Sequence, residues 1–145
     1  MSRLFALVAI ALSSSLPAAP VPKEVRKDTK FEGTWLIESV VIYGEALDLA
    51  TKQYWTLDAD GHMKTHDDPD MPGSGPSIVQ MVIDTAAKSI DYKYSNGNNS
   101  VHPAVYIMAG DTLKICSNMK GTGIRPAAVV AGPDVYVYTL QRVKR

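Results

Sequence analysis

Hydrophobic and polar residues alternate with a period of two along most of the chain after Phe31, and turn-forming residues separate the alternating runs. The alternation is clearest at residues 90–94, where Ile90, Tyr92 and Tyr94 fall on one face. Such alternation is typical of strands that bury one face and expose the other. The pattern predicts strands at residues 35–43, 54–57, 62–66, 78–83, 90–94, 104–108, 112–117 and 135–141, with a further candidate at 127–130.

The turns between these runs determine how the strands connect. Asp60-Gly61 is a strong hairpin signal, and Gly110-Asp111 separates two later runs in the same way. Strands joined by so few residues must be antiparallel, because a parallel crossover needs about a dozen residues or more. We therefore predict an all-β fold, a single antiparallel up-and-down β-barrel of about eight strands, because closure removes the unpaired edges of the sheet. A β-sandwich is the alternative, and residues 45–52 predict one short helical segment.

The first 19 residues have the three-part pattern of a secretory signal peptide: a basic Arg3, an apolar stretch at 4–12, and small residues up to Ala19. The apolar stretch is too short to span a bilayer, which needs about 20 residues, so no transmembrane segment is expected after signal removal. Residues 20–30 are polar and contain proline, as in a linker or a disordered N-terminus. We therefore assign 31–145 to the barrel domain and expect a secreted or periplasmic protein of the cell envelope.

Composition limits the class of partner. The chain has 15 basic and 15 acidic side chains, so it lacks the excess positive charge that attracts nucleic acid or anionic lipid. We expect no nucleic-acid partner. Cys116 is the only cysteine, so no disulfide can form within the chain and the fold must depend on its core.

An ordered series of short motifs resembles a lipocalin-like domain family of planctomycete bacteria, a domain of unknown function. The resemblance covers about residues 31–143 and extends to the wider lipocalin group through the G-x-W triplet, at Gly33 and Trp35, and the late Arg142. It implies that Gly33 lets the chain cross under the barrel, that Trp35 plugs this end, and that Arg142 packs on the indole. The motifs are Gly33-Thr34-Trp35, the Asp-Gly hairpin after Tyr54-Trp55-Thr56-Leu57, Ile90-Asp91-Tyr92, Gly110-Asp111-Thr112-Leu113-Lys114-Ile115-Cys116, Arg125-Pro126 and Tyr138-Thr139-Leu140-Gln141-Arg142.

Two pairs of residues have side chains that could bind a metal ion or act in catalysis. His62 and His66 share one face of a predicted strand but stand about 13 Å apart, too far for one metal ion. Cys116 and His102 could form a nucleophile and base, but the strand pattern around Cys116 is typical of a half-buried structural thiol. We therefore predict no metal site, no cofactor and no enzymatic activity.

Inward-facing aromatic and methionine side chains are the remaining functional signal. An eight-stranded barrel is just wide enough to be filled by side chains or to hold one small ligand. The first outcome predicts a cell-envelope module that binds another protein through its loops. The second predicts an exported, non-catalytic protein that binds a small hydrophobic molecule. The candidate ligand-binding residues are Trp55, Met81, Tyr92, Tyr94, Tyr106 and Met108, and Tyr136 and Tyr138 belong to the same inward set.

Overall fold

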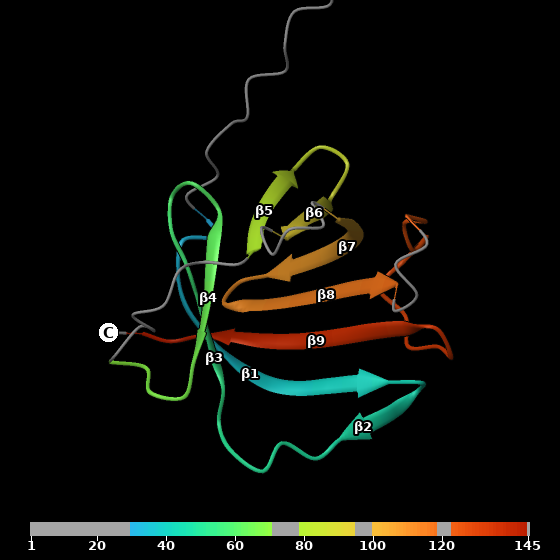
Figure 1. The fold of residues 1–145 in the computed structure, drawn as a ribbon. Helices are drawn as coiled ribbons and strands as arrows, with labels where there is room; N and C mark the ends of the chain where they lie inside the picture. The colour runs from blue at the N-terminus through green and yellow to red at the C-terminus, as the bar shows by residue number, and fades with distance from the viewer. Residues whose placement is uncertain (1–29, 71–78, 95–99, 119–122, 145) are drawn as a thin grey trace, which may run out of the picture.

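Nine β-strands make up the described part of the protein, a computed structural model that covers residues 30–70, 79–94, 100–118 and 123–144 (Figure 1). Their bounds follow the predicted runs closely, because the alternation of hydrophobic side chains determines where a half-buried strand can form. The strands are β1 (Gly33–Ile42), β2 (Glu45–Leu47), β3 (Tyr54–Leu57), β4 (His62–His66), β5 (Val79–Asp84), β6 (Ser89–Tyr94), β7 (Val101–Ala109), β8 (Thr112–Asn118) and β9 (Val135–Arg142).

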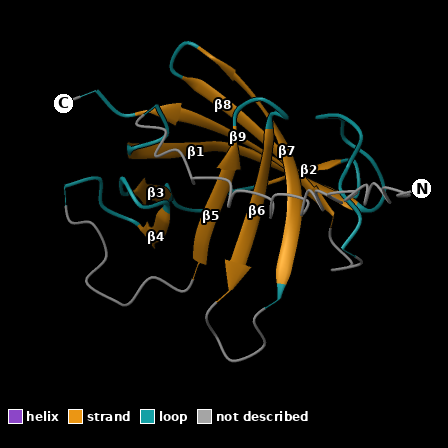
Figure 2. Cartoon of the chain, turned by 90° about the horizontal axis from the view of Figure 1, so that it is seen from above, coloured by secondary structure: helices purple, strands orange, loops and turns teal. Residues whose placement is uncertain are grey.

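The sheet closes into a barrel. From β3 to β9 each strand pairs antiparallel with the next, and β1 pairs with both β3 and β9. Eight strands therefore form a ring, and β2 lies outside it, paired with the end of β1. Seen from above in Figure 2, β5, β6 and β7 form one side of the barrel and β1, β8 and β9 lie across from them. The prediction of an antiparallel up-and-down barrel of about eight strands is confirmed.

The predicted helical segment at 45–52 is wrong, because no described residue there is helical. Tyr43 and Gly44 both have positive φ, 55° and 80°, as in a tight hairpin turn, so the chain returns along β1 and Glu45–Leu47 forms β2. A helix of residues 45–52 would be too short to be stable by itself. The unpaired edge at the end of β1, in contrast, provides hydrogen-bond partners for the backbone of Glu45–Leu47. Pairing with a neighbouring strand therefore overrides local helix propensity.

The extra strand candidate at 127–130 is also wrong, since these residues form no strand. Both edges of β8 and β9 are already paired within the ring, so no backbone partner is left for another strand beside them. Arg125 instead fixes this connection to the barrel wall: its guanidinium donates to the carbonyls of Ala104 (2.6 Å) and Ile90 (3.2 Å) and pairs with Asp91 at 2.7 Å. The segment is thereby attached to the outside of β6 and β7.

The Asp-Gly hairpin between β3 and β4 depends on a close backbone approach. Gly61 has φ +82°, its carbonyl accepts the N–H of Met81 at 2.8 Å, and a Cβ there would lie 2.3 Å from the Met81 oxygen. Only glycine satisfies both conditions. Asp58 completes the turn, since its carboxylate accepts the N–H groups of Asp60 and His62, each at 2.9 Å.

The end of the barrel where β1 begins and β9 ends is called the floor. The opposite end, where β1 ends and β9 begins, is called the mouth. Side chains from β1, β6, β8 and β9 meet in the lower half and are inaccessible to solvent. They are Trp35, Ile90, Leu113, Ile115 and Leu140, each 0% exposed. The lower half of the barrel is therefore filled by its own side chains.

The described residues contain no helix long and apolar enough to cross a bilayer. The predicted signal peptide at 1–19 lies outside the described residues, as do residues 20–29 of the predicted linker.

Candidate functional site

The floor of the barrel brings together Gly33, Trp35 and Arg142. The Trp35 indole donates from Nε1 to the carbonyl of Phe31 at 2.9 Å, and the Arg142 guanidinium carbon lies 4.2 Å from the indole ring centroid. Arg142 also donates to the carbonyl of Glu32 at 2.6 Å and to that of Lys30. The guanidinium thus holds the entering chain against the ring, so this cluster closes the floor of the barrel.

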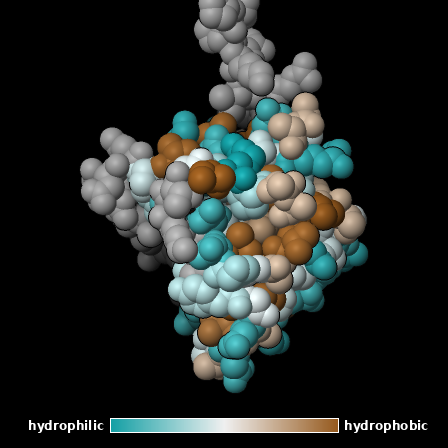
Figure 3. All heavy atoms as spheres, turned by 90° about the vertical axis from the view of Figure 1, so that its right-hand side faces the viewer, coloured by the Kyte–Doolittle hydropathy of each residue, from teal (hydrophilic) through white to brown (hydrophobic). Residues whose placement is uncertain are grey.

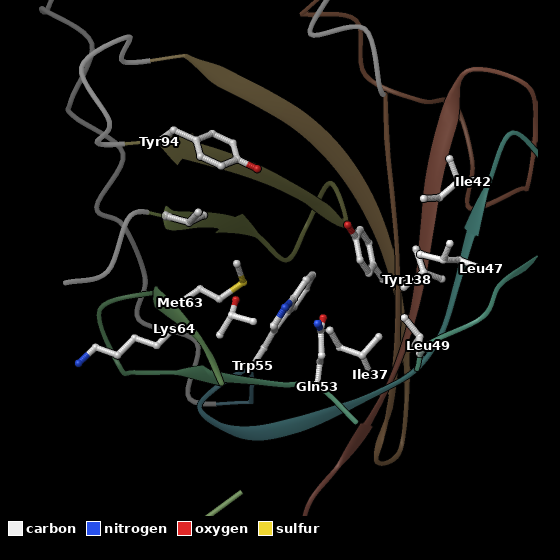
Figure 4. A pocket seen from close by; sticks show the side chains of 13 residues that line it. Ile37, Ile42, Leu47, Leu49, Gln53, Trp55, Met63, Lys64, Tyr94 and Tyr138 are labelled. Carbon is white, nitrogen blue, oxygen red and sulfur yellow. The ribbon is translucent and has the colours of Figure 1, made fainter. Parts of the chain in front are cut away.

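A cavity of about 510 Å³ lies in the upper half of the barrel, and we call it the apolar cavity. Its volume falls within the range of small-molecule sites, about 300–1,000 Å³. Figure 4 shows Trp55 between Met63 and Tyr138, and Ile42, Leu47 and Leu49 along the opposite side. It is lined by Ile37, Val40, Ile42, Leu47, Leu49, Gln53, Trp55, Met63, Lys64, Thr65, Val79, Tyr94 and Tyr138.

The apolar cavity reaches the ladder between β4 and β5. Among the described residues these two strands pair at two positions, His62 with Gln80 and Met63 with Val79. Met63 and Val79 both line the cavity, so the cavity borders this ladder. Figure 3 faces the mouth end, where hydrophobic side chains (brown) gather next to hydrophilic ones.

A second cavity of about 320 Å³ adjoins the first, and we call it the tyrosine cavity. Trp55, Met63, Tyr94 and Tyr138 line both cavities. The rest of its lining is polar or aromatic: Tyr92, His102, Ser117, Asn118 and Tyr136. The rings pack closely, with centroid distances of 4.9 Å for Trp55 and Tyr138, 5.0 Å for Tyr94 and His102, and 6.3 Å for Tyr136 and Tyr138. The two cavities share an aromatic wall, and the tyrosine cavity is the more polar of the two.

Tyr92 is the deepest of these phenols. The side chain is buried, and its hydroxyl has no hydrogen-bond partner among the described residues. Burial raises the pKa of Tyr92 well above 10.0, and the nearby phenols of Tyr138 and Tyr94 raise that pKa further. Burial likewise raises the pKa of Tyr94 and that of Tyr138. These phenols are therefore neutral at physiological pH, and each can donate one hydrogen bond.

The structure places the six candidate ligand-binding residues at different heights. Trp55, Tyr92 and Tyr94 meet at the two cavities, whereas Met81 lies in the packed core below them. Tyr106 packs edge-on against Phe31 at 5.0 Å and lines a hollow at the floor end with Met108 and Lys88. The candidates therefore do not form one site.

Several residues of the two cavities were not among the six candidates. Tyr136 and Tyr138 belong to the inward set. Their alternation with Val137 is the sequence signal that indicates an inward orientation. Met63 lies in a strand of mixed polarity, and Leu47 and Leu49 lie in the segment that was expected to be helical. Sequence periodicity therefore carried no signal for these three residues.

The described residues contain no group of three His, Cys, Asp or Glu side chains that could hold a metal ion, and His66 of β4 makes structural contacts. His66 donates from Nδ1 to the carbonyl of Asp68 and accepts at Nε2 from Thr56 at 2.7 Å. Its ring also stacks on Tyr54, with centroids 5.8 Å apart. Both ring nitrogens of His66 are thus occupied by structural hydrogen bonds.

Cys116 and His102 lie on opposite faces of the barrel wall. His102 lines the tyrosine cavity, whereas Cys116 lies between the inward residues Ile115 and Ser117 and faces outward. The thiol is 0% exposed rather than half-buried, because the connection before β9 covers it and the Val130 carbonyl lies 3.8 Å from the sulfur. Burial raises the pKa of Cys116 above 9.0, as expected for an unreactive structural thiol.

No family model, curated protein or solved structure matches the chain at a significant level.

Proposed function

We propose that this protein is an exported, non-catalytic binding protein that holds one small, mostly apolar molecule in the upper half of its barrel. The observation that carries the proposal is the contrast between the two halves of the interior. Fully buried side chains fill the interior of the lower half, and the hollow at the floor end is lined in part by Lys30 and Lys88, whereas the upper half contains the apolar cavity and the tyrosine cavity. A barrel that only needed a stable core would gain from filling this space.

The lining of the apolar cavity supports a small apolar ligand. Aliphatic and aromatic side chains surround it, and the few polar groups include the amide of Gln53 and the hydroxyls of Tyr94 and Tyr138. In Figure 4 the ammonium group of Lys64 points away from the cavity, so only the aliphatic stem contributes to the wall. Such a site binds through apolar contact and uses a few polar groups for orientation.

Export and family membership are further parts of the proposal. The signal-peptide pattern at residues 1–19 supports a secreted or periplasmic protein. The G-x-W triplet and Arg142 support membership of the lipocalin-like group, since they meet at the closed end of an eight-stranded barrel.

The binding proposal is tested with N-phenylnaphthylamine, a neutral dye whose emission rises in apolar surroundings. Leu49→Trp introduces an indole into the apolar cavity and should weaken binding about tenfold or more. The matched control is Ile107→Trp, which places the same indole at a 51% exposed position on β7 and should leave binding unchanged. Ile107 also lines the hollow at the floor end, so if Ile107→Trp blocks the dye and Leu49→Trp does not, the dye binds in that hollow instead.

The alternative function, a cell-envelope interaction module with a filled core, is tested in the same experiment. It is favoured if the dye does not bind at all and if native mass spectrometry of protein purified from its own host shows no co-purified small molecule. Export is tested separately by N-terminal sequencing of the secreted or periplasmic protein. A mature chain that still contains Arg3 would contradict signal cleavage.

A further inference from the structure

The Tyr92 hydroxyl is the one buried side-chain polar group without a partner among the described residues. A buried hydroxyl that loses its water without gaining a hydrogen bond destabilises the fold. Such groups are rare in folded proteins, and each calls for a physical explanation. Here the hydroxyl belongs to a side chain that lines the tyrosine cavity, so a bound molecule can supply the missing partner.

The groups around Tyr92 determine what that partner can be. The phenols of Tyr94 and Tyr138 are close enough to affect Tyr92 electrostatically, and Figure 4 shows their hydroxyls directed into the interior. Each phenol has a single O–H to donate. A compact acceptor such as a carbonyl oxygen can therefore accept the hydrogen bond that the Tyr92 hydroxyl has left to donate.

The charge of the site favours a neutral acceptor over an anion. The described lining includes no arginine, Lys64 directs its ammonium group away, and His102 packs its ring against Tyr94. A carboxylate in this space would lose its hydration without a paired cation, which is strongly unfavourable. Burial of a ketone or ester carbonyl costs much less hydration free energy than burial of a carboxylate, and the carbonyl can accept a hydrogen bond from Tyr92.

We infer that the apolar ligand carries an uncharged carbonyl group, a ketone or an ester, that accepts a hydrogen bond from the Tyr92 hydroxyl. The inference rests on the proposed function and specifies its ligand class. The apolar part of the molecule lies against Trp55 and the aliphatic wall, and the carbonyl lies in the tyrosine cavity. Tyr92 thereby orients the ligand within the barrel.

The test uses two matched probes: prodan, a naphthyl ketone, and dimethylaminonaphthalene, which lacks the ketone. The wild-type protein should bind prodan about five- to tenfold more tightly, the value of one buried hydrogen bond. In Tyr92→Phe this preference should disappear, while binding of the ketone-free probe stays unchanged. The control Tyr43→Phe removes a hydroxyl from a 66% exposed side chain that is not part of the described lining of either cavity, and it should keep the preference.

Prodan also reports the contact directly, because its emission shifts to the red when its carbonyl accepts a hydrogen bond. We expect bound prodan to emit further to the blue in Tyr92→Phe than in the wild type. The inference is overturned if the wild type binds both probes equally, or if the preference persists in Tyr92→Phe. If neither probe binds the wild type, the proposed binding function and the inference about the carbonyl group are both overturned.

Charge selectivity is measured by displacing prodan with methyl decanoate or with decanoate. These two share one alkyl chain and differ in charge at neutral pH. The ester should displace the probe at a concentration at least about tenfold lower, because the carboxylate would be buried without a cation. Displacement at lower concentrations of decanoate would overturn the assignment of a neutral head group.

Discussion

The Arg142 guanidinium carbon lies 4.2 Å from the centroid of the Trp35 ring, which joins the last strand of the barrel to the first. The two residues also form a backbone pair in the β1–β9 ladder, so the side-chain contact reinforces the seam that closes the ring. The Arg142 head group is fixed further by the carbonyls of Glu32 and Lys30. Closure therefore depends on ladder hydrogen bonds and on one stacked guanidinium.

Trp35→Ala should destabilise the protein by about 3–5 kcal/mol, because it removes a fully buried indole and leaves a cavity at the floor. Urea unfolding followed by far-ultraviolet circular dichroism measures the change. Trp35→Phe keeps an aromatic face under Arg142 and should cost less. A near-neutral result for Trp35→Ala would mean that the indole does not plug the floor.

Gly33→Ala should destabilise the protein by about 1–3 kcal/mol, because φ is +128° there, a region that side chains rarely adopt. The new Cβ would also lie 3.0 Å from Nη1 of Arg142, whose position is fixed by its carbonyl partners. Urea unfolding gives the size of the loss, and near-ultraviolet circular dichroism reports the environment of Trp35.

Gly110→Ala is the matched control for Gly33→Ala. Its φ of +58° is also positive, but its Cβ would meet nothing within 4 Å. We expect a smaller loss of stability and an unchanged near-ultraviolet spectrum. Equal losses and unchanged spectra in both variants would show that backbone strain alone matters and that the contact with Arg142 does not.

The acid side of the stability curve should depend on Asp111. Its carboxylate accepts from Lys144 at 2.8 Å and lies 3.8 Å from Arg142, and these cations hold the pKa of Asp111 below 3.8. A lowered folded-state pKa stabilises the fold above the unfolded-state pKa, and this contribution is lost as the pH falls through the folded-state pKa. Wild type and Asp111→Asn should therefore differ at neutral pH and converge in acid.

Lys144→Gln removes the other partner of the Asp111–Lys144 ion pair, and it tests the same contact from the basic side. The pKa of Lys144 is raised above 10.5 by Asp111, so its contribution is lost as the pH rises through that raised value. Thermal unfolding across the pH range measures both variants. The effect should be small and should shrink with added salt, because both groups are exposed. A stability difference that persists in strong acid would contradict the ion pair.

The barrel could be predicted from sequence because its determinants are local. Alternation marks which side chains face inward, and short turns force antiparallel neighbours. The segment at Glu45–Leu47 could not be predicted in this way, since its strand forms only because the edge of β1 is available. The same tertiary effect excludes a strand at 127–130, where no free edge exists.

The candidate site was harder to predict for a geometric reason. Alternation indicates whether a side chain faces inward but not its height along the barrel axis, which depends on register and strand tilt. Trp55 and Tyr106 both face inward, yet Trp55 lines the apolar cavity and Tyr106 packs against Phe31 at the floor. Height along the barrel axis separates cavity-lining residues from core residues, and it is determined only once the strands are paired.

Tyr92→Phe should stabilise the ligand-free protein by about 1 kcal/mol, because it removes a buried hydroxyl that has no described partner and keeps the ring. Thermal and urea unfolding of ligand-free protein measure the gain. Tyr94→Phe is the control, since Tyr94 is only half-buried, and it should change stability by less than about 0.5 kcal/mol. A loss of stability in Tyr92→Phe would show that the hydroxyl already has a partner in the free protein.

The two expected effects of Tyr92→Phe have opposite signs, and their combination is what distinguishes a binding group from a structural one. A structural hydroxyl contributes to stability and its removal weakens the fold. A hydroxyl kept free for a ligand lowers the stability of the empty protein and adds affinity in the complex, as functional sites commonly do. A more stable variant that has lost its preference for the ketone would therefore identify Tyr92 as the residue that orients the ligand.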